Sequence, residues 1–106
     1  MSFQLYYLPS YERCVKHLGQ RERHIAKLVV LALLSYFSSG KPISGSPFIF
    51  EYEQRSYRLI FKKLRDLIWE AYIEGKVRVL TRLEKDIHYL VFAGNHDQVR
   101  QFLKSF

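Results

Sequence analysis

The feature that most constrains the fold is a set of three short runs in which apolar side chains recur at alternate positions. They are Leu67–Ile73, Val77–Leu83 and Ile87–Ala93. This period of two is typical of β-strands with one buried face. Only Glu74–Lys76 and Glu84–Asp86 separate the runs, and three-residue loops are common hairpin connections. The sequence therefore predicts an antiparallel three-stranded meander.

Loops of three residues also predict which residues face each other across the meander. In this register Ala71 lies opposite Val79, and Val79 lies opposite Val91. One face is then almost wholly apolar and is expected to carry a helix: Leu67, Trp69, Ala71, Ile73, Val77, Val79, Leu83, Ile87, Val91 and Ala93. The other face is mixed: Glu70, Tyr72, Arg78, Arg82, His88 and Phe92, with Leu80 and Leu90 at its middle and Lys76 at its rim.

The N-terminal half contains one expected strand and two expected helices. The run Phe3–Leu8 is aromatic and aliphatic, which predicts a strand that Pro9 ends. Ser10 is placed to cap a short helix that ends at Gly19. The stretch Gln20–Ser39 has apolar residues at helical spacing, and it predicts the longest helix, with a nearly all-apolar C-terminal part.

The segment between this helix and the meander has two interpretations. Lys41–Pro47 is rich in Pro, Gly and Ser and is expected to be a loop. Phe48–Tyr52 and Tyr57–Phe61 fit a hairpin around Glu53–Ser56. Alternatively, Tyr57–Phe61 begins a short helix that leads to Leu64.

Gly94 and Asn95 interrupt the last strand, and Asp97–Phe106 predicts a short C-terminal helix. At 106 residues the chain is long enough for one domain with a real core. The predicted fold is α+β: an N-terminal strand, two helices on one face of a mostly antiparallel sheet, a C-terminal meander and a short terminal helix. We expect a single domain over residues 1–106.

The formal charge of +7 is concentrated in the middle of the chain. Residues 55–82 hold eight Lys and Arg against three Asp and Glu, and residues 83–106 have equal numbers of both signs. A basic patch of this kind attracts phosphate backbones through counterion release. The charge therefore indicates a nucleic-acid partner, although basic surfaces also occur only for solubility.

Several function classes lack a signal in this sequence. The single Cys14 gives neither a disulfide framework nor a zinc cluster. The longest apolar run, Leu28 to Leu34, is too short to span a bilayer, and the N-terminus does not have the order of a signal peptide. Nucleotide-binding glycine loops and Ser–His–Asp motifs are missing. We expect a cytoplasmic protein with no metal, no small-molecule cofactor and no membrane partner.

The mixed face carries residues that could cleave single-stranded RNA. Arginines can hold a phosphate, an aromatic ring can stack a base, and a histidine can move a proton. His96 has the parity of this face just beyond the last strand, and Glu70 lies diagonal to Arg78. The same pattern also fits an ordinary solvated sheet face, on which a lone His88 or His96 has no chemistry.

Three segments carry a resemblance to a known family. They are Leu67-Ile68-Trp69-Glu70-Ala71-Tyr72-Ile73-Glu74-Gly75-Lys76-Val77-Arg78-Val79-Leu80, Lys62-Lys63-Leu64 and Gly94-Asn95-His96-Asp97-Gln98-Val99. With the predicted order of elements, they resemble the RelE/ParE superfamily of type II toxins. The resemblance implies a ribosome-dependent, metal-independent mRNA endoribonuclease, neutralised by an acidic cognate antitoxin.

The resemblance also implies roles for particular residues. Arg78 would contact the scissile phosphate, His96 would be a general acid or base, and Glu70 would orient Arg78 or serve as the base. The basic residues expected to line the RNA path are Lys62, Lys63 and Arg65. Lys76, Arg82 and Tyr72 complete the expected RNA-binding set.

The sequence departs from the family pattern at two places. Ala71 and Tyr72 stand where many members carry an arginine, and Asp97 and Gln98 stand where ribonuclease members have a terminal tyrosine. A second hypothesis is therefore a binding module without chemistry, either a gyrase-inhibiting toxin or an RNA- or protein-binding domain. A toxin-like fold kept as a structural partner is a third.

Overall fold

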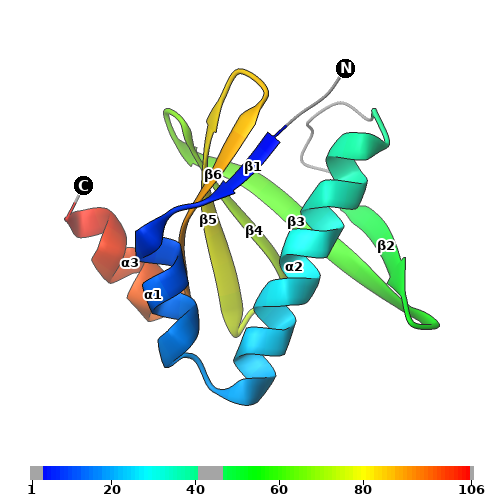
Figure 1. The fold of residues 1–106 in the computed structure, drawn as a ribbon, viewed down its shortest axis with the longest axis horizontal. Helices are drawn as coiled ribbons and strands as arrows, with labels where there is room; N and C mark the ends of the chain where they lie inside the picture. The colour runs from blue at the N-terminus through cyan, green and yellow to red at the C-terminus, as the bar shows by residue number, and fades with distance from the viewer. Residues whose placement is uncertain (1–3, 41–46, 106) are drawn as a thin grey trace.

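The computed structural model describes residues 4–40 and 47–105 of the chain. Its elements in chain order are β1 (Gln4–Tyr7), α1 (Pro9–His17), α2 (Gln20–Ser38), β2 (Phe48–Tyr52), β3 (Arg55–Arg65), β4 (Ile68–Glu74), β5 (Val77–Glu84), β6 (Ile87–Gly94) and α3 (His96–Lys104) (Figure 1). The predicted loop residues 41–46, the first strand residue Phe3 and the helix end Phe106 lie outside the described residues.

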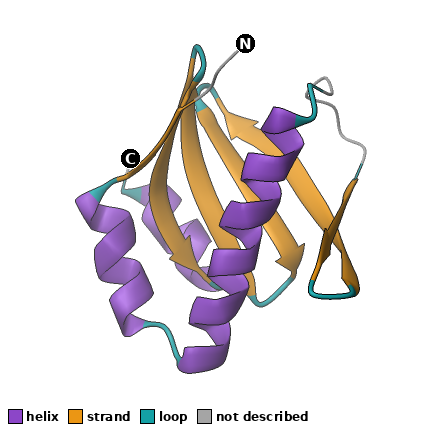
Figure 2. Cartoon of the chain, turned by 45° about the vertical axis from the view of Figure 1, so that its right-hand side comes forward, coloured by secondary structure: helices purple, strands orange, loops and turns teal. Residues whose placement is uncertain are grey.

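The six strands of the described residues belong to one sheet with the order β1-β6-β5-β4-β3-β2. Strand β1 pairs in parallel with β6, and the other pairs are antiparallel. The predicted α+β fold with its C-terminal meander is therefore confirmed. The sheet curls strongly around α2, which crosses its concave side (Figure 2).

Each hairpin of the sheet closes with two residues between the last paired positions. Tyr52 pairs with Arg55, so the turn is Glu53-Gln54, and both residues have positive φ, at 50° and 66°. Positive φ at both central positions is typical of a type I′ turn. The predicted β2–β3 hairpin is confirmed, and the alternative helix toward Leu64 is wrong because β3 continues as a strand to Arg65.

The two meander loops are also shorter than expected, since Glu74 pairs with Val77 and Glu84 with Ile87. A β-bulge in each hairpin compensates for part of this change. In the first hairpin Ala71 pairs with Val79 as predicted. In the second, Val79 pairs with Ala93 and the predicted partner Val91 is wrong.

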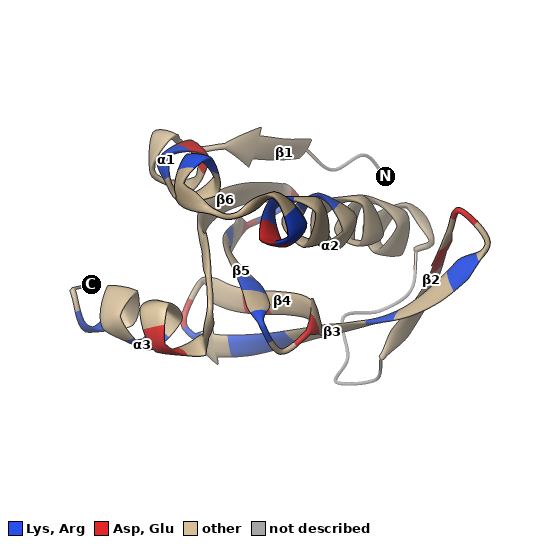
Figure 3. Cartoon of the chain, turned by 90° about the horizontal axis from the view of Figure 1, so that it is seen from below, with Lys and Arg blue, Asp and Glu red and all other residues tan. Residues whose placement is uncertain are grey.

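The helices lie on opposite faces of the sheet (Figure 3). Helix α2 buries Val29, Ala32 and Leu33 against Ala71 and Val79 in the main core. Helix α3 lies on the other face, where Val99 packs with Ile68, Leu80 and Val91. We call the sheet side that carries α3 the α3 face.

The helix termini are set by local side chains. Pro9 occupies the first turn of α1, where a missing backbone N–H has no cost. The expected N-cap Ser10 is inside the helix instead, and its hydroxyl donates to the Val91 carbonyl at 2.7 Å. Asn95 and Gln98 form a capping box that begins α3. Within the described residues, no helix has the length and apolar character needed to cross a membrane.

Candidate nucleic-acid interface

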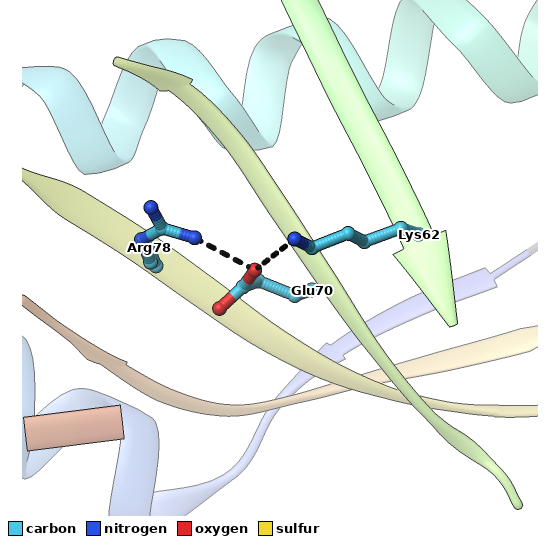
Figure 4. Close-up of polar contacts among 3 residues, drawn as sticks. All are labelled: Lys62, Glu70 and Arg78. Atoms are coloured by element: carbon cyan, nitrogen blue, oxygen red, sulfur yellow. Dashed lines mark hydrogen bonds and ion pairs between the residues drawn. The ribbon is translucent and has the colours of Figure 1, made fainter. Parts of the chain in front are cut away.

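The α3 face carries a buried carboxylate that is bonded to an arginine. Glu70 on β4 is 3% exposed. Arg78 on β5 donates from Nη1 to Oε1 of Glu70 at 2.9 Å (Figure 4). The predicted diagonal contact between these residues is therefore present. A charge-assisted bond of this kind fixes the guanidinium in one orientation.

Two more predicted residues complete this cluster. Lys62 on β3 pairs directly with Glu70, and its Nζ lies 3.7 Å from the same Oε1. The Arg78 guanidinium carbon lies 4.3 Å from the centre of the Tyr72 ring, a cation–π distance. Lys62, Glu70, Tyr72 and Arg78, which we call the Arg78 cluster, thus come from three adjacent strands.

His96 is the first residue of α3, so it belongs to the same side of the sheet as Arg78. Arg78 pairs with Gly94, only two residues before His96. Lys76 lines a cavity of 410 Å³ together with Asn95 and Gln98 at the beginning of α3. The structure therefore brings Lys76 and strand β5, which carries Arg78, to the helix end that carries His96. The His96 side chain forms no hydrogen bond or ion pair with another described residue.

The remaining basic candidates lie at separate places on the sheet. Lys63 pairs with Trp69, whose ring stacks on Phe61 in the α2 core, so Lys63 belongs to the α2 side. Arg65 donates to the Leu103 carbonyl in the last turn of α3 at 3.2 Å. Arg82 lies on the α3 face at the far end of β5 and is ion-paired with Glu84.

Two members of the predicted mixed face lie on the α2 side instead. His88 is 2% exposed, and its ring centre lies 4.1 Å from that of Phe37. Leu90 belongs to the α2 core. The prediction was wrong because the second loop is one residue shorter than assumed. Burial lowers the pKa of His88 from 6.5 to about 4, so this side chain is neutral at neutral pH.

Two tyrosines on the α3 face were not singled out in the sequence analysis. Tyr6 on β1 and Tyr89 on β6 stack with ring centres 5.8 Å apart. The sequence signal was weak, because only the parallel pairing of β1 with β6 brings these residues together. Aromatic rings beside cations are the usual contacts for single-stranded nucleic acids.

The Arg78 cluster can orient a phosphate and hold negative charge, because Arg78 has further N–H donors beyond the one given to Glu70. Glu70 itself is buried between two cations, an arrangement that suits positioning rather than proton transfer. His96 is exposed and can exchange protons with a substrate. Among residues 4–40 and 47–105, no group of three His, Cys, Asp or Glu is arranged to hold a metal ion.

Two helices on one face of a curled, mostly antiparallel sheet and a short helix on the other define the α+β fold of this chain. The chain is similar to the crystal structure of a copper-bound mutant toxin from Helicobacter pylori, with a TM-score of 0.51 and 10% sequence identity. The match covers 92% of this chain and 99% of the toxin. A scan of family models and a search of curated proteins gave no match. The structural likeness extends to the fold of a bacterial toxin.

Proposed function

We propose that the protein is a toxin that cleaves mRNA on the ribosome, with the Arg78 cluster and His96 as its active site. The observation that supports this proposal most is the hydrogen bond between Arg78 and buried Glu70, beside the beginning of α3. Arg78 stabilises the charge that develops on the scissile phosphate. Glu70 is a positioning residue that holds the guanidinium in place.

The proposed reaction is an internal transesterification of RNA. His96 takes the proton of the 2′-hydroxyl, and the 2′ oxygen forms a bond to the adjacent phosphorus. The bond from phosphorus to the 5′ oxygen breaks, and that oxygen takes a proton from solvent. The products are a 2′,3′-cyclic phosphate and a 5′-hydroxyl end. Lys62 and Lys76 supply further positive charge along the RNA backbone.

The partners follow from the same surface. An mRNA segment contacts the basic α3 face, and an acidic antitoxin covers it when the toxin is inhibited. Lys62, Arg78 and Arg82 place positive charge on the α3 face, which complements both partners. The cytoplasm is the compartment in which translated mRNA is present.

Induced expression tests this function. The wild type is expected to arrest growth and to cut mRNA. His96→Ala is expected to reduce the cleavage rate by about 10²- to 10⁴-fold, the usual contribution of a general acid or base. His24→Ala is the matched control, because His24 is an exposed histidine on α2, away from the α3 face. Normal growth during expression of the folded wild type would refute the toxin proposal.

A second candidate is a binding toxin without chemistry, directed at gyrase or another target. It is favoured by the neutralisation of Arg78 by Glu70, and by the fact that none of the residues that the structure describes orients the His96 side chain. This candidate predicts growth arrest without mRNA cuts, with equal arrest by the wild type and His96→Ala. Parallel mapping of mRNA ends and of DNA breaks separates the two.

A further inference from the structure

The stacked pair Tyr6 and Tyr89 lies at the β1 edge of the α3 face, away from the Arg78 cluster. The two residues are directly paired between β1 and β6, and their ring planes differ by 21°. Tyr6 is 48% exposed, so much of its ring remains accessible to solvent. Its hydroxyl donates to Oε1 of Gln4 at 3.0 Å, which limits the rotation of the side chain.

A half-exposed arginine adjoins this pair. Arg82 on β5 pairs directly with Tyr89. Within the described residues the guanidinium is ion-paired with partly exposed Glu84, an interaction that contributes little at a solvated site and that an incoming phosphate can replace. The row Arg82, Tyr89 and Tyr6 therefore presents one cation followed by two aromatic rings across three adjacent strands.

This row and the Arg78 cluster share a sheet face. Side chains alternate along a strand, so Arg78 and Arg82 on β5 point to the same side, as does Leu80 between them. Four residues of strand correspond to about 13 Å. Helix α3 contacts the face between the two positions: it begins two residues beyond the partner of Arg78, and its last turn is bonded to Arg65.

We propose that Tyr6, Tyr89 and Arg82 form a base-stacking subsite for single-stranded RNA. The proposal rests on the proposed function, because it extends the RNA path along the α3 face from the Arg78 cluster. A base stacks on the exposed ring of Tyr6, and Arg82 contacts a neighbouring phosphate. Stacking accepts any base, so the subsite contributes affinity without sequence preference.

The neighbouring residue Tyr7 offers a matched control. It is 51% exposed on the same strand, but its ring lies 5.8 Å from that of Tyr11 on α1, on the opposite side of the sheet. Substitution of either Tyr6 or Tyr7 therefore removes an exposed tyrosine from β1. Only the Tyr6 change removes an aromatic ring from the α3 face.

The test is direct binding of a fluorescein-labelled RNA of about 12 alternating cytidines and adenosines. Its riboses are 2′-O-methylated, so the wild-type protein cannot cleave it through the 2′-hydroxyl. Tyr6→Leu keeps an apolar side chain without a π face and is expected to weaken binding about tenfold or more. Tyr6→Phe and Tyr7→Leu are expected to remain within about twofold of the wild type. Arg82→Gln is expected to reduce the slope of log affinity against log salt by about 0.7.

Wild-type affinity for Tyr6→Leu would overturn the subsite, and loss of binding in Tyr7→Leu to the same degree would overturn it as well. If Tyr6→Leu unfolds, Tyr6→Phe and Arg82→Gln still decide: weakened binding in the first, or an unchanged salt slope in the second, contradicts the proposal.

Failure of the subsite with continued mRNA cutting leaves the proposed function standing. A weakened Tyr6→Leu with no cutting by the wild type supports the subsite and refutes the cleavage. Absence of RNA binding by the wild type overturns the subsite, whereas the growth and mRNA-cutting experiment decides the proposed function separately.

Discussion

Replacing Arg78 by methionine is expected to destabilise the folded protein in addition to removing a positive charge from the site. Methionine has similar length but cannot donate to Glu70, whose carboxylate is buried and accepts a hydrogen bond from Arg78. A buried charge without its partner keeps the full cost of desolvation. A loss of activity in such a variant therefore reflects both the lower stability of the fold and the missing positive charge.

The size of the effect follows from the surroundings of the pair. Removing one partner of a buried ion pair costs about 3–5 kcal/mol. Lys62 lies 3.7 Å from the same carboxylate oxygen, and the Arg78 side chain is 16% exposed, so part of the charge remains compensated. We expect Arg78→Met to cost about 2–3 kcal/mol. The free energy of unfolding of a folded domain is usually about 5–15 kcal/mol. Because the expected loss is smaller than this, the variant is expected to stay folded.

Urea denaturation of four proteins measures the interaction: the wild type, Arg78→Met, Glu70→Gln and the double variant. Arg78→Met is expected to lower the midpoint by about 1 M. The double variant contains no buried charge at this position, so it is expected to be more stable than the sum of the single effects predicts, by about 1–2 kcal/mol. Single effects that add within about 0.5 kcal/mol would refute a specific Glu70–Arg78 interaction. Arg78→Lys, which keeps the charge, is then the better variant for activity.

Two further predictions concern buried and capping residues. The unfolded chain takes up a proton on His88 near pH 6.5, whereas the folded chain does so only near pH 4, so stability is full above pH 6.5 and falls as the pH drops through this window. Between pH 7 and pH 5 this amounts to about 2 kcal/mol, and a urea series with His88→Leu should show a shallower pH dependence by that amount; an unchanged slope would contradict the burial argument. Asn95→Ala removes the capping box of α3 and is expected to cost about 1 kcal/mol, with faster amide exchange in α3 but not in α2. Equal amide exchange rates in α3 of the wild type and of Asn95→Ala would show that packing alone fixes this helix end.

Most elements of the fold could be predicted because their patterns are local. The alternation in Val77–Leu83 and the helical spacing in Gln20–Ser39 each appear within a few residues of sequence, and both elements are present. The register of the second hairpin could not be predicted. The run Ile87–Ala93 is apolar at nearly every position, so the pattern does not distinguish its two faces, and the shorter loop placed His88 on the α2 side.

The candidate site was partly predictable for a similar reason. Glu70 and Arg78 could be placed on one face because the apolar residues that alternate with them, such as Ala71 and Val79, mark the opposite face of β4 and β5. Lys63 was grouped with Lys62 because both belong to the Lys62-Lys63-Leu64 segment of the family resemblance, although neighbours in a strand point to opposite faces. The Tyr6–Tyr89 pair depends on a contact between the first and last strands, and no local pattern indicates that contact.

The docking of the first strand and helix on the last strand affects how the protein is made. Ser10 in α1 bonds to Val91, 81 residues later in the chain, and β1 pairs with the same strand β6. During synthesis at about 5–20 residues per second, β1 and α1 wait about 4–16 s for this partner. Until then the α3 face, which β6 and α3 complete, does not exist. A nascent chain of this protein therefore has no assembled α3 face while most of its sequence has already been translated.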